Sequence, residues 1–176
     1  RIFTKKATGR ILRAAFNHAV KNGFRSVTVC EKPNVIRETS GMMYKMAQEI
    51  QRGEFPGIEL WNTNIDAQMM WLTKNPEDYG VIVAGNMFGD IITDLGAITQ
   101  GGMGIVAGGN INPEGVSMFE PIGGSAPKYT GQGVINPLAA ICAGAMLLDS
   151  LGEEEAAQAI ESAVAWATGE KLESMS

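Results

Sequence analysis

The sequence predicts an α/β fold, because short strand-like runs alternate with longer helical runs through residues 1–100. Three runs rich in β-branched and other apolar residues are predicted to be strands: residues 26–30, 57–61 and 81–84. Charged residues follow each run, first Lys32, then Asp66, then Asp90 and Asp94. Open α/β sheets bind ligands at the carboxyl ends of their strands, so we expect these residues to share one pocket if the strands are neighbours.

The runs before, between and after the strands carry apolar residues at the spacing of amphipathic helices. The first of them places Leu12 and Phe16 on one face, and Gly23 is expected to end it. The last of them starts directly after the third strand and carries Asp90 and Asp94. The predicted helices of this half of the chain cover residues 8–21, 36–50, 67–73 and 86–94.

The composition changes after Gln100, where glycines become frequent. This passage predicts a flexible, closely packed hinge, so we expect two domains, residues 1–100 and 101–176. A short strand is predicted at 117–120, followed by a glycine-rich loop. Within this loop, at 121–133, glycines would let a ligand touch backbone N–H groups, and Lys128 would offer a charge to a phosphate. The alternative is an ordinary surface loop.

Two further helices are predicted at the end of the chain. Asn136 is a favourable N-cap residue, and Pro137 suits the first position of a helix. The helix from there to Leu151 is nearly all apolar, so we expect it to be buried on most sides. The last predicted helix, 153–168, is amphipathic with acidic residues in its first turn.

Composition excludes some classes of function. The chain has 176 residues, of which 45% are hydrophobic, and its net charge of −5 argues against a nucleic-acid partner. No apolar run reaches the roughly 20 residues of a membrane helix, so we expect no membrane partner. Cys30 and Cys142 lie in apolar runs, which predicts reduced core thiols in a cytoplasmic protein. Because Arg1 replaces a start methionine, we expect a fragment of a longer polypeptide.

Asp90 and Asp94 are the clearest candidates for a metal site. Residues four apart share one face of a helix, and two carboxylates held so closely repel unless a cation lies between them. Hard oxygen ligands favour Mg²⁺ or Mn²⁺. The alternative is a pair of solvated carboxylates on an exposed face. Lys32 likewise is either a functional group or a surface charge after a strand.

Four stretches together resemble the β-decarboxylating dehydrogenases, the family of 3-isopropylmalate, isocitrate, homoisocitrate and tartrate dehydrogenases. The resemblance is strongest to the 3-isopropylmalate branch. It implies the isopropylmalate/isocitrate dehydrogenase fold, which is α/β but not a Rossmann fold, with an N-terminal part missing. Residues 1–100 would form a small dimerisation and catalytic domain, and 101–176 the C-terminal part of a large cofactor-binding domain. The stretches are residues 31–35, 65–67, 85–94 and 119–127.

The resemblance also implies roles for individual residues. Asp90 and Asp94 would bind the metal together with Asp66 of the partner subunit in a homodimer with shared active sites. Lys32, also donated across the dimer, would be the catalytic acid/base residue. The resemblance implies that Asn34 contacts the cofactor or the substrate. The other cofactor-binding residues it implies are Glu120, Gly124, Ser125, Ala126 and Asn136.

The chain departs from the family pattern at three places. Gly123 stands where the family usually has a histidine, which removes an adenine-stacking group. Lys128 and Tyr129 replace an aspartate and a small apolar residue of the NAD-using members, and they suit the 2′-phosphate of NADP. The overall likeness favours NAD, so both cofactors stay open. Phe3 aligns with the catalytic tyrosine of the isopropylmalate branch, so either the alignment slips there or the proton is delivered differently.

The resemblance implies metal-dependent oxidative decarboxylation of a 3-carboxy-2-hydroxy acid, with 3-isopropylmalate, a substrate of leucine biosynthesis, as first candidate. Isocitrate and homoisocitrate are the rival substrates, since the substrate-selecting residues would precede Arg1. A non-catalytic regulatory subunit of the same fold is the alternative of a different class. Such subunits typically lose the metal aspartates or the lysine, whereas this chain keeps Lys32, Asp66, Asp90 and Asp94.

Overall fold

A computed structural model describes residues 2–170 and forms two compact units, Arg1–Leu95 and Gly96–Ser176. We call these the first and the second unit and describe each by itself. The division falls inside one helix rather than in the glycine-rich passage after Gln100. The assignment of residues 1–100 and 101–176 to a small and a large domain stays a prediction.

The first unit contains the alternating strands and helices that the sequence predicts, with some shifted ends. The second strand begins and ends later than expected, so Asp66 lies in the first turn of the helix that follows it. The elements are α1 (Lys5–Lys21), β1 (Ser26–Glu31), α2 (Arg37–Glu54), β2 (Glu59–Asn64), α3 (Ile65–Lys74), a 3₁₀ turn (Pro76–Asp78), β3 (Val81–Ala84) and α4 (Asn86–Thr99).

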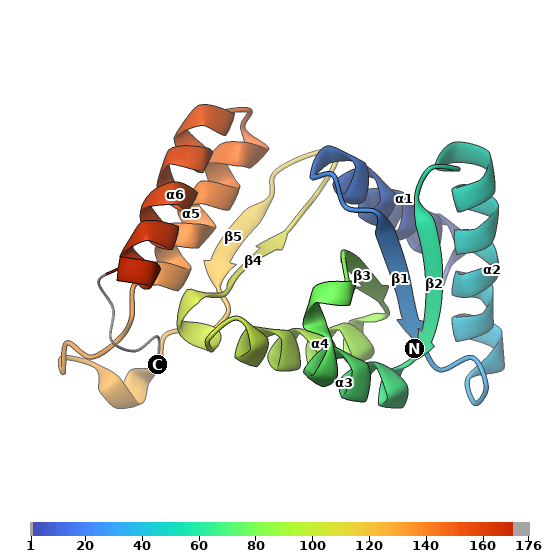
Figure 1. Cartoon of the computed structure of the whole chain (residues 1–176), viewed down its shortest axis with the longest axis horizontal. Helices are drawn as coiled ribbons and strands as arrows, with labels where there is room; N and C mark the ends of the chain where they lie inside the picture. The colour runs from blue at the N-terminus through green and yellow to red at the C-terminus, as the bar shows by residue number, and fades with distance from the viewer. Residues whose placement is uncertain (1, 171–176) are drawn as a thin grey trace. The chain divides into compact units, whose positions relative to one another are not determined.

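The three strands form a parallel sheet in the order β2-β1-β3. Every residue of the central strand β1 is buried, because α1 and α2 cover one face and α3 and α4 cover the other (Figure 1). Val27 and Val29 pack into the core that α1 and α2 form. Cys30, on the opposite face, packs with Leu72 of α3 and Ile92 of α4. The fold class predicted from the sequence is therefore confirmed.

Helix α1 shows how the local sequence produces the packing. The Thr4 side chain caps its start by accepting a hydrogen bond from the N–H of Ala7 at 3.2 Å. Leu12 and Phe16 lie on one face of the helix and are fully buried. Phe16 also stacks on Phe55, with ring centroids 5.1 Å apart. This apolar face holds α1 against the sheet.

The second unit pairs an antiparallel ribbon with two helices. The ribbon corrects one expectation, because part of the glycine-rich passage is a strand and not only a hinge. Gly109 pairs with Phe119, and a Cβ atom at Gly109 would lie 3.1 Å from that ring, so the absence of a side chain permits the pairing. The elements are a 3₁₀ turn (Met103–Ile105), β4 (Ala107–Asn110), β5 (Met118–Pro121), a second 3₁₀ turn (Pro127–Tyr129), α5 (Leu138–Ser150) and α6 (Glu154–Glu170).

Helix α5 is less buried than its apolar composition predicts. It packs against α6 and against β4 and β5, where small side chains such as Ala143 and Ala145 are buried. Ile141 and Leu147 are each 42% exposed, so the expectation of burial on most sides was wrong. A helix that is apolar all round carries no pattern that shows which of its faces is packed.

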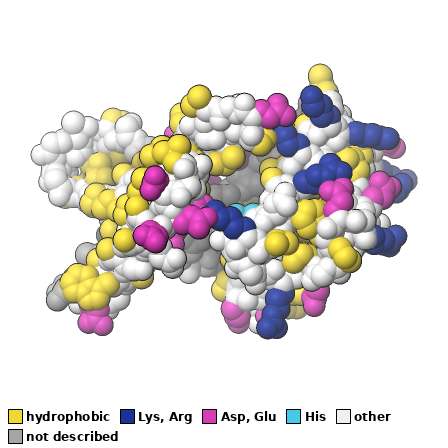
Figure 2. Space-filling view, turned by 90° about the horizontal axis from the view of Figure 1, so that it is seen from above, with side chains coloured by type: hydrophobic (Ala, Val, Ile, Leu, Met, Phe, Trp, Pro, Cys, Tyr) yellow, Lys and Arg dark blue, Asp and Glu magenta, His cyan; other side chains and the backbone are white. Residues whose placement is uncertain are grey.

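The described surface is mixed in charge. On the face shown in Figure 2, lysine and arginine side chains are interspersed with acidic ones. One exposed pair is the bidentate contact between Arg13 of α1 and Glu54 of α2, with nitrogen–oxygen distances down to 2.6 Å. Within the described part of the chain, none of the helices has the length and apolarity needed to cross a membrane.

Candidate active site

The carboxyl edge of the parallel sheet brings two of the predicted residues together. Lys32 follows β1 and Asp66 opens α3 after β2, and these strands are neighbours. Lys32 Nζ donates a hydrogen bond to Asp66 Oδ1 and forms an ion pair with it. This hydrogen bond holds the pKa of Asp66 below its ordinary value, while desolvation opposes the shift. We call this contact the Lys32–Asp66 pair.

Asp90 and Asp94 lie on the outer face of α4, which starts after β3 on the other side of β1. Both are exposed, whereas Phe88 and Ile92 of the same helix are buried at 6% and 8% exposure. We call the two residues the Asp90/Asp94 pair. Among residues 2–170, no three His, Cys, Asp or Glu side chains gather closely enough to hold a metal ion. Within one chain, Asp66 therefore does not complete a three-carboxylate site with the Asp90/Asp94 pair.

Sequence reasoning missed a buried carboxylate beneath this edge. Glu31, the last residue of β1, is 2% exposed. Its oxygens accept hydrogen bonds from Ser40 Oγ at 2.6 Å and from the N–H of Gly85 at 2.8 Å. No local pattern marks Glu31 as buried, because its partners lie on α2 and after β3.

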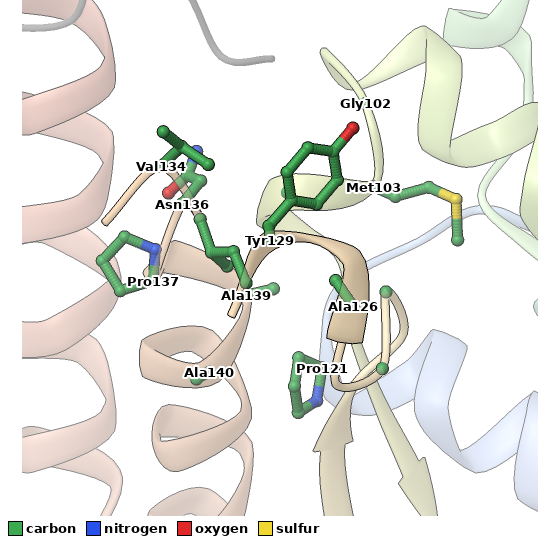
Figure 3. Close-up of a pocket in the computed structure, with 14 residues that line it drawn as sticks. Gly102, Met103, Pro121, Ala126, Tyr129, Val134, Asn136, Pro137, Ala139 and Ala140 are labelled. Carbon is green, nitrogen blue, oxygen red and sulfur yellow. The ribbon is translucent and has the colours of Figure 1, made fainter. Parts of the chain in front are cut away.

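The second unit contains a pocket of about 580 Å³, which is within the size range of small-molecule sites. Its walls are backbone, small and apolar side chains and one aromatic ring. Figure 3 shows the ring of Tyr129 standing between Asn136 and Val134 on one side and Met103 on the other. The lining residues are Gly102, Met103, Gly104, Pro121, Gly123, Gly124, Ala126, Tyr129, Val134, Ile135, Asn136, Pro137, Ala139 and Ala140.

The pocket includes half of the predicted cofactor-binding residues. Gly124, Ala126, Tyr129 and Asn136 line it, whereas the remaining four do not. Those four are Asn34, which is exposed in the first unit, and Glu120, Ser125 and Lys128, which are exposed in the second.

Two of these outer residues have defined contacts. Lys128 Nζ lies 5.2 Å from the centroid of the Tyr129 ring, so a positive charge stands beside the pocket. Glu120 accepts a hydrogen bond from Asn110 Nδ2 at 3.3 Å, across the ribbon of β4 and β5.

Backbone conformation shapes the pocket wall. Gly124 has a φ of 65°, and Ala126, with a φ of 40°, is the one non-glycine residue of the described chain with a positive φ. Glycine adopts a positive φ without strain, whereas Ala126 is strained, and strained residues of this kind gather at ligand sites. Helix α5 begins at Leu138 with Pro137 in the N-cap position, so the predicted start, with Asn136 as the N-cap, lies one residue too early. Asn136 Oδ1 accepts a hydrogen bond from the N–H of Leu138 at 3.0 Å, just before the helix. The amide NH₂ is therefore the part of Asn136 that could serve a ligand.

Several pocket residues had no signal in the sequence. Gly102 and Met103 precede β4, whereas Val134 and Ile135 precede α5. Only the packing of α5 against the ribbon brings these two segments to one cavity.

Known proteins resemble this chain over nearly its whole length. Residues 1–174 match the protein family described as isocitrate/isopropylmalate dehydrogenase. A 3-isopropylmalate dehydrogenase of Corynebacterium diphtheriae is 41% identical over 170 residues, which cover 96% of this chain and 50% of that protein. A homoisocitrate dehydrogenase of Methanocaldococcus jannaschii is 40% identical over 164 residues, covering 93% of this chain and 46% of that protein.

A solved structure shows the same fold. The crystal structure of isocitrate dehydrogenase from Methylococcus capsulatus matches with a TM-score of 0.87 and 40% identity, covering 92% of this chain and 47% of that one. The chain thus spans about half the length of the curated relatives it matches. With this sequence identity, this structural match and the family match over residues 1–174, the chain belongs to the isocitrate/isopropylmalate dehydrogenase family and has its α/β fold.

Proposed function

We propose that this chain serves a metal-dependent oxidative decarboxylation of a 3-carboxy-2-hydroxy acid with a nicotinamide cofactor. The observation that carries the proposal is the Lys32–Asp66 pair at the carboxyl edge of the sheet, next to the strand that leads into the helix of Asp90 and Asp94. In the proposal Lys32 serves as the acid/base group, and Asp66, Asp90 and Asp94 serve as metal ligands. The family likeness supports 3-isopropylmalate as the first candidate substrate.

The residues present fit a hard divalent ion. Asp90 and Asp94 expose two carboxylates four residues apart on one helix, and carboxylate oxygen is the ligand that Mg²⁺ and Mn²⁺ prefer. A second copy of the chain would donate Asp66 as the third ligand. When bound, the ion would supply Lewis-acid charge to the substrate's hydroxyl and carboxylate groups, and the nicotinamide would accept the hydride.

Lys32 has the role of proton carrier in this proposal. Its side chain is 21% exposed, so Nζ is sheltered yet reachable, and Asp66 fixes its direction. With its amine neutral, Nζ would accept the proton of the substrate hydroxyl while the carbon that bears this hydroxyl gives its hydride to the nicotinamide. Asp66 is 69% exposed and thus able to turn one oxygen toward Lys32 and the other toward a ligand.

We propose a homodimer with shared active sites, supported by apolar side chains exposed on α3 and α4. Met70 and Trp71 of α3 are 56% and 41% exposed, and Met87 and Ile91 of α4 are 47% and 46% exposed. Met87 precedes Asp90 by three residues and Ile91 precedes Asp94 by three, so each apolar side chain is a neighbour of one carboxylate on the helix surface. Pairing two copies through these helices would bury this apolar surface and bring the Asp90/Asp94 pair to the other chain's Lys32–Asp66 pair.

The pocket of the second unit would hold the adenosine part of the cofactor. Its apolar walls suit an adenine ring, and Asn136 and the backbone around Gly124 offer polar contacts. The positive charge of Lys128 beside Tyr129 supports NADP, whereas the relatedness to 3-isopropylmalate dehydrogenases supports NAD. We propose NAD as the first candidate and NADP as its rival.

The alternatives remain an isocitrate or homoisocitrate dehydrogenase and a non-catalytic subunit. Relatives with the first two names match at 40% identity, so the substrate is not decided by similarity. A cytoplasmic location and a place in leucine biosynthesis are part of the 3-isopropylmalate proposal. The retained Lys32, Asp66, Asp90 and Asp94 favour an enzyme over a regulatory subunit.

The test is a steady-state assay of the protein as it occurs, including any segment that precedes Arg1. We expect turnover with Mg²⁺ or Mn²⁺ that chelation abolishes and metal restores. kcat/KM is compared for 3-isopropylmalate, isocitrate and homoisocitrate with NAD and with NADP. Nucleotide binding without turnover of any of the three acids would favour the regulatory subunit and contradict the enzyme.

A further inference from the structure

Glu31 is a buried charge that the proposed chemistry does not use. Its side chain is 2% exposed, and both of its hydrogen-bond donors are neutral: Ser40 Oγ and the N–H of Gly85. Burying a carboxylate is costly unless its oxygens are hydrogen-bonded. Hydrogen bonds to a charged acceptor are short and strong, so these two contacts fix the carboxylate and its donors in place.

The first contact of Glu31 fixes the segment that carries Lys32. Ser40 lies on α2, is 1% exposed and donates to Glu31 Oε2 at 2.6 Å. The same Ser40 oxygen accepts a hydrogen bond from the backbone N–H of Lys32 at 3.4 Å. The carbonyl of Lys32 in turn accepts from the N–H of Ile36 at 2.8 Å, at the entry to α2. The backbone of Lys32 is therefore held from both sides.

The second contact of Glu31 fixes the start of α4. Glu31 Oε1 accepts from the N–H of Gly85 at 2.8 Å, and Gly85 is buried between β3 and α4. The carbonyl of Gly85 accepts the N–H of Gly89 at 2.8 Å, which is a hydrogen bond of the first helical turn. The position of Gly85 thus determines where the helix begins and where Asp90 lies.

We propose that Glu31 is a positioning residue that holds the backbone of Lys32 and the first turn of α4 at a fixed separation. Within each chain it thereby fixes the Lys32–Asp66 pair and the Asp90/Asp94 pair, which belong to the two different active sites of the proposed dimer. This inference rests on the proposed function, which assigns those side chains to catalysis. Glu31 and Ser40 are both buried, so they act through the groups they hold and not by touching substrate.

Three variants separate this role from simple stabilisation, all made in the protein as it occurs. Glu31→Ala removes both acceptors. Glu31→Gln keeps the shape, since its amide oxygen can accept from Gly85 while its NH₂ donates to Ser40 Oγ. Ser40→Ala removes one contact and keeps the carboxylate. Ile50→Ala is the matched control, because Ile50 is also buried on α2, at 5% exposure, but packs into the core away from this network.

We expect Glu31→Ala to lower kcat and the affinity for Mn²⁺ by about 10- to 100-fold, as for other groups that orient a metal site from behind it. The Gly85 amide should exchange hydrogen faster, as measured by NMR. Glu31→Gln should retain most of the wild-type kcat and Mn²⁺ affinity. Ser40→Ala should lose less of both than Glu31→Ala does. Ile50→Ala should lower Tm without changing kcat, Mn²⁺ affinity or Gly85 exchange.

Unchanged Gly85 exchange, kcat and Mn²⁺ affinity in folded Glu31→Ala would overturn the inference, as would an equal loss in Ile50→Ala. If Glu31→Ala does not fold, Ser40→Ala decides by kcat and Mn²⁺ affinity, because it removes the contact that holds the Lys32 backbone and leaves the Glu31–Gly85 contact in place. A wild-type protein that neither binds Mn²⁺ nor turns over any of the three acids contradicts the proposed function instead. In that case the exchange of the Gly85 amide alone decides whether Glu31 anchors the helix.

Discussion

In the first unit the candidate site consists of charged side chains at the edge of a parallel sheet, whereas in the second it consists mainly of backbone around a pocket. Lys32 and Asp66 owe their positions to strand ends, and each contributes one chemical group. Gly124 and Ala126 shape the pocket through their backbone, which has positive φ at both residues, and their side chains offer no reactive group. We therefore expect single side-chain deletions to matter most in the first unit and changes of backbone freedom to matter most in the second.

The largest expected effect comes from deleting charges in the first unit. Lys32→Ala should lose about 10²- to 10⁴-fold in kcat, the range for removing an acid/base group, and Asp90→Ala should lose most of its activity because it lacks a proposed metal ligand. In a shared-site dimer, each mixed pair of these inactive chains has one intact site. Equal mixing should therefore recover about a quarter of the wild-type activity, since about half of the dimers are mixed.

The control for this experiment is Lys45→Ala, which removes an exposed lysine of α2 and should retain activity. Subunit exchange is verified by mass spectrometry. Absence of any recovery in exchanged dimers would contradict the shared site. Full activity of Lys32→Ala would remove the contrast between the two units altogether.

The second effect tests whether a side chain also matters at the pocket. Lys128 places its charge 5.2 Å from the ring centre of Tyr129, where a 2′-phosphate would be attracted. A charge-assisted hydrogen bond is worth about 1.5–3 kcal/mol, so Lys128→Asp should weaken NADP by roughly 10- to 100-fold. NAD lacks the phosphate and serves as the internal control in a comparison of kcat/KM. If kcat/KM of the wild type strongly favours NAD and Lys128→Asp shows the same preference, the hypothesis that NADP is the cofactor is wrong.

The third effect compares two adjacent glycines of the pocket. Gly124 has a φ of 65°, so Gly124→Ala should lower the free energy of unfolding by about 1–2 kcal/mol, although its Cβ would meet open space. Gly123 lacks a positive φ, and its Cβ would have only an ordinary contact at 3.9 Å. Gly123→Ala should therefore leave stability nearly unchanged. Urea unfolding measures the free energy of unfolding of both variants. Equal losses of stability in the two would contradict the idea that the positive φ of Gly124 requires a glycine.

The smallest effect concerns the pH dependence of stability that Cys30 produces. Cys30 is fully buried near the carboxyl end of β1. Burial raises the pKa of its thiol from 9.0 to about 11, while a hydrogen bond with Thr63 opposes the shift. In the unfolded chain the thiol ionises at a lower pH than in the fold. The raised pKa of Cys30 therefore contributes fully to the free energy of unfolding below pH 9, and this contribution is lost as the pH rises through 11. At pH 10 the loss should be about 1 kcal/mol.

Other groups also titrate in this range, so Cys30→Ala is the reference. The difference in unfolding free energy between wild type and Cys30→Ala should narrow from pH 9 to pH 11. A difference that is constant over this range would show that the thiol titrates normally in the fold.

Much of the first unit could be predicted from the sequence. The alternation of strands and helices follows from local periodicity, and the strand at Val81–Ala84 has its predicted bounds. The spacing of Asp90 and Asp94 placed both on one helical face, because helix geometry is local. The motif at residues 31–35 and the one at 85–94 pointed to the family, which the comparisons confirm.

Contacts between distant residues were decided only by the tertiary structure. The order β2-β1-β3 brings Lys32 to Asp66, and the covering of both faces of β1 buries Glu31 between Ser40 and Gly85.

The same limit applies in the second unit. The glycines of β4 form a strand because they pair with β5. Ile141 stays exposed because α5 packs on only part of its surface, against α6 and the ribbon of β4 and β5. Sequence periodicity determines which residues share a face, whereas the packing of whole elements determines what each face meets.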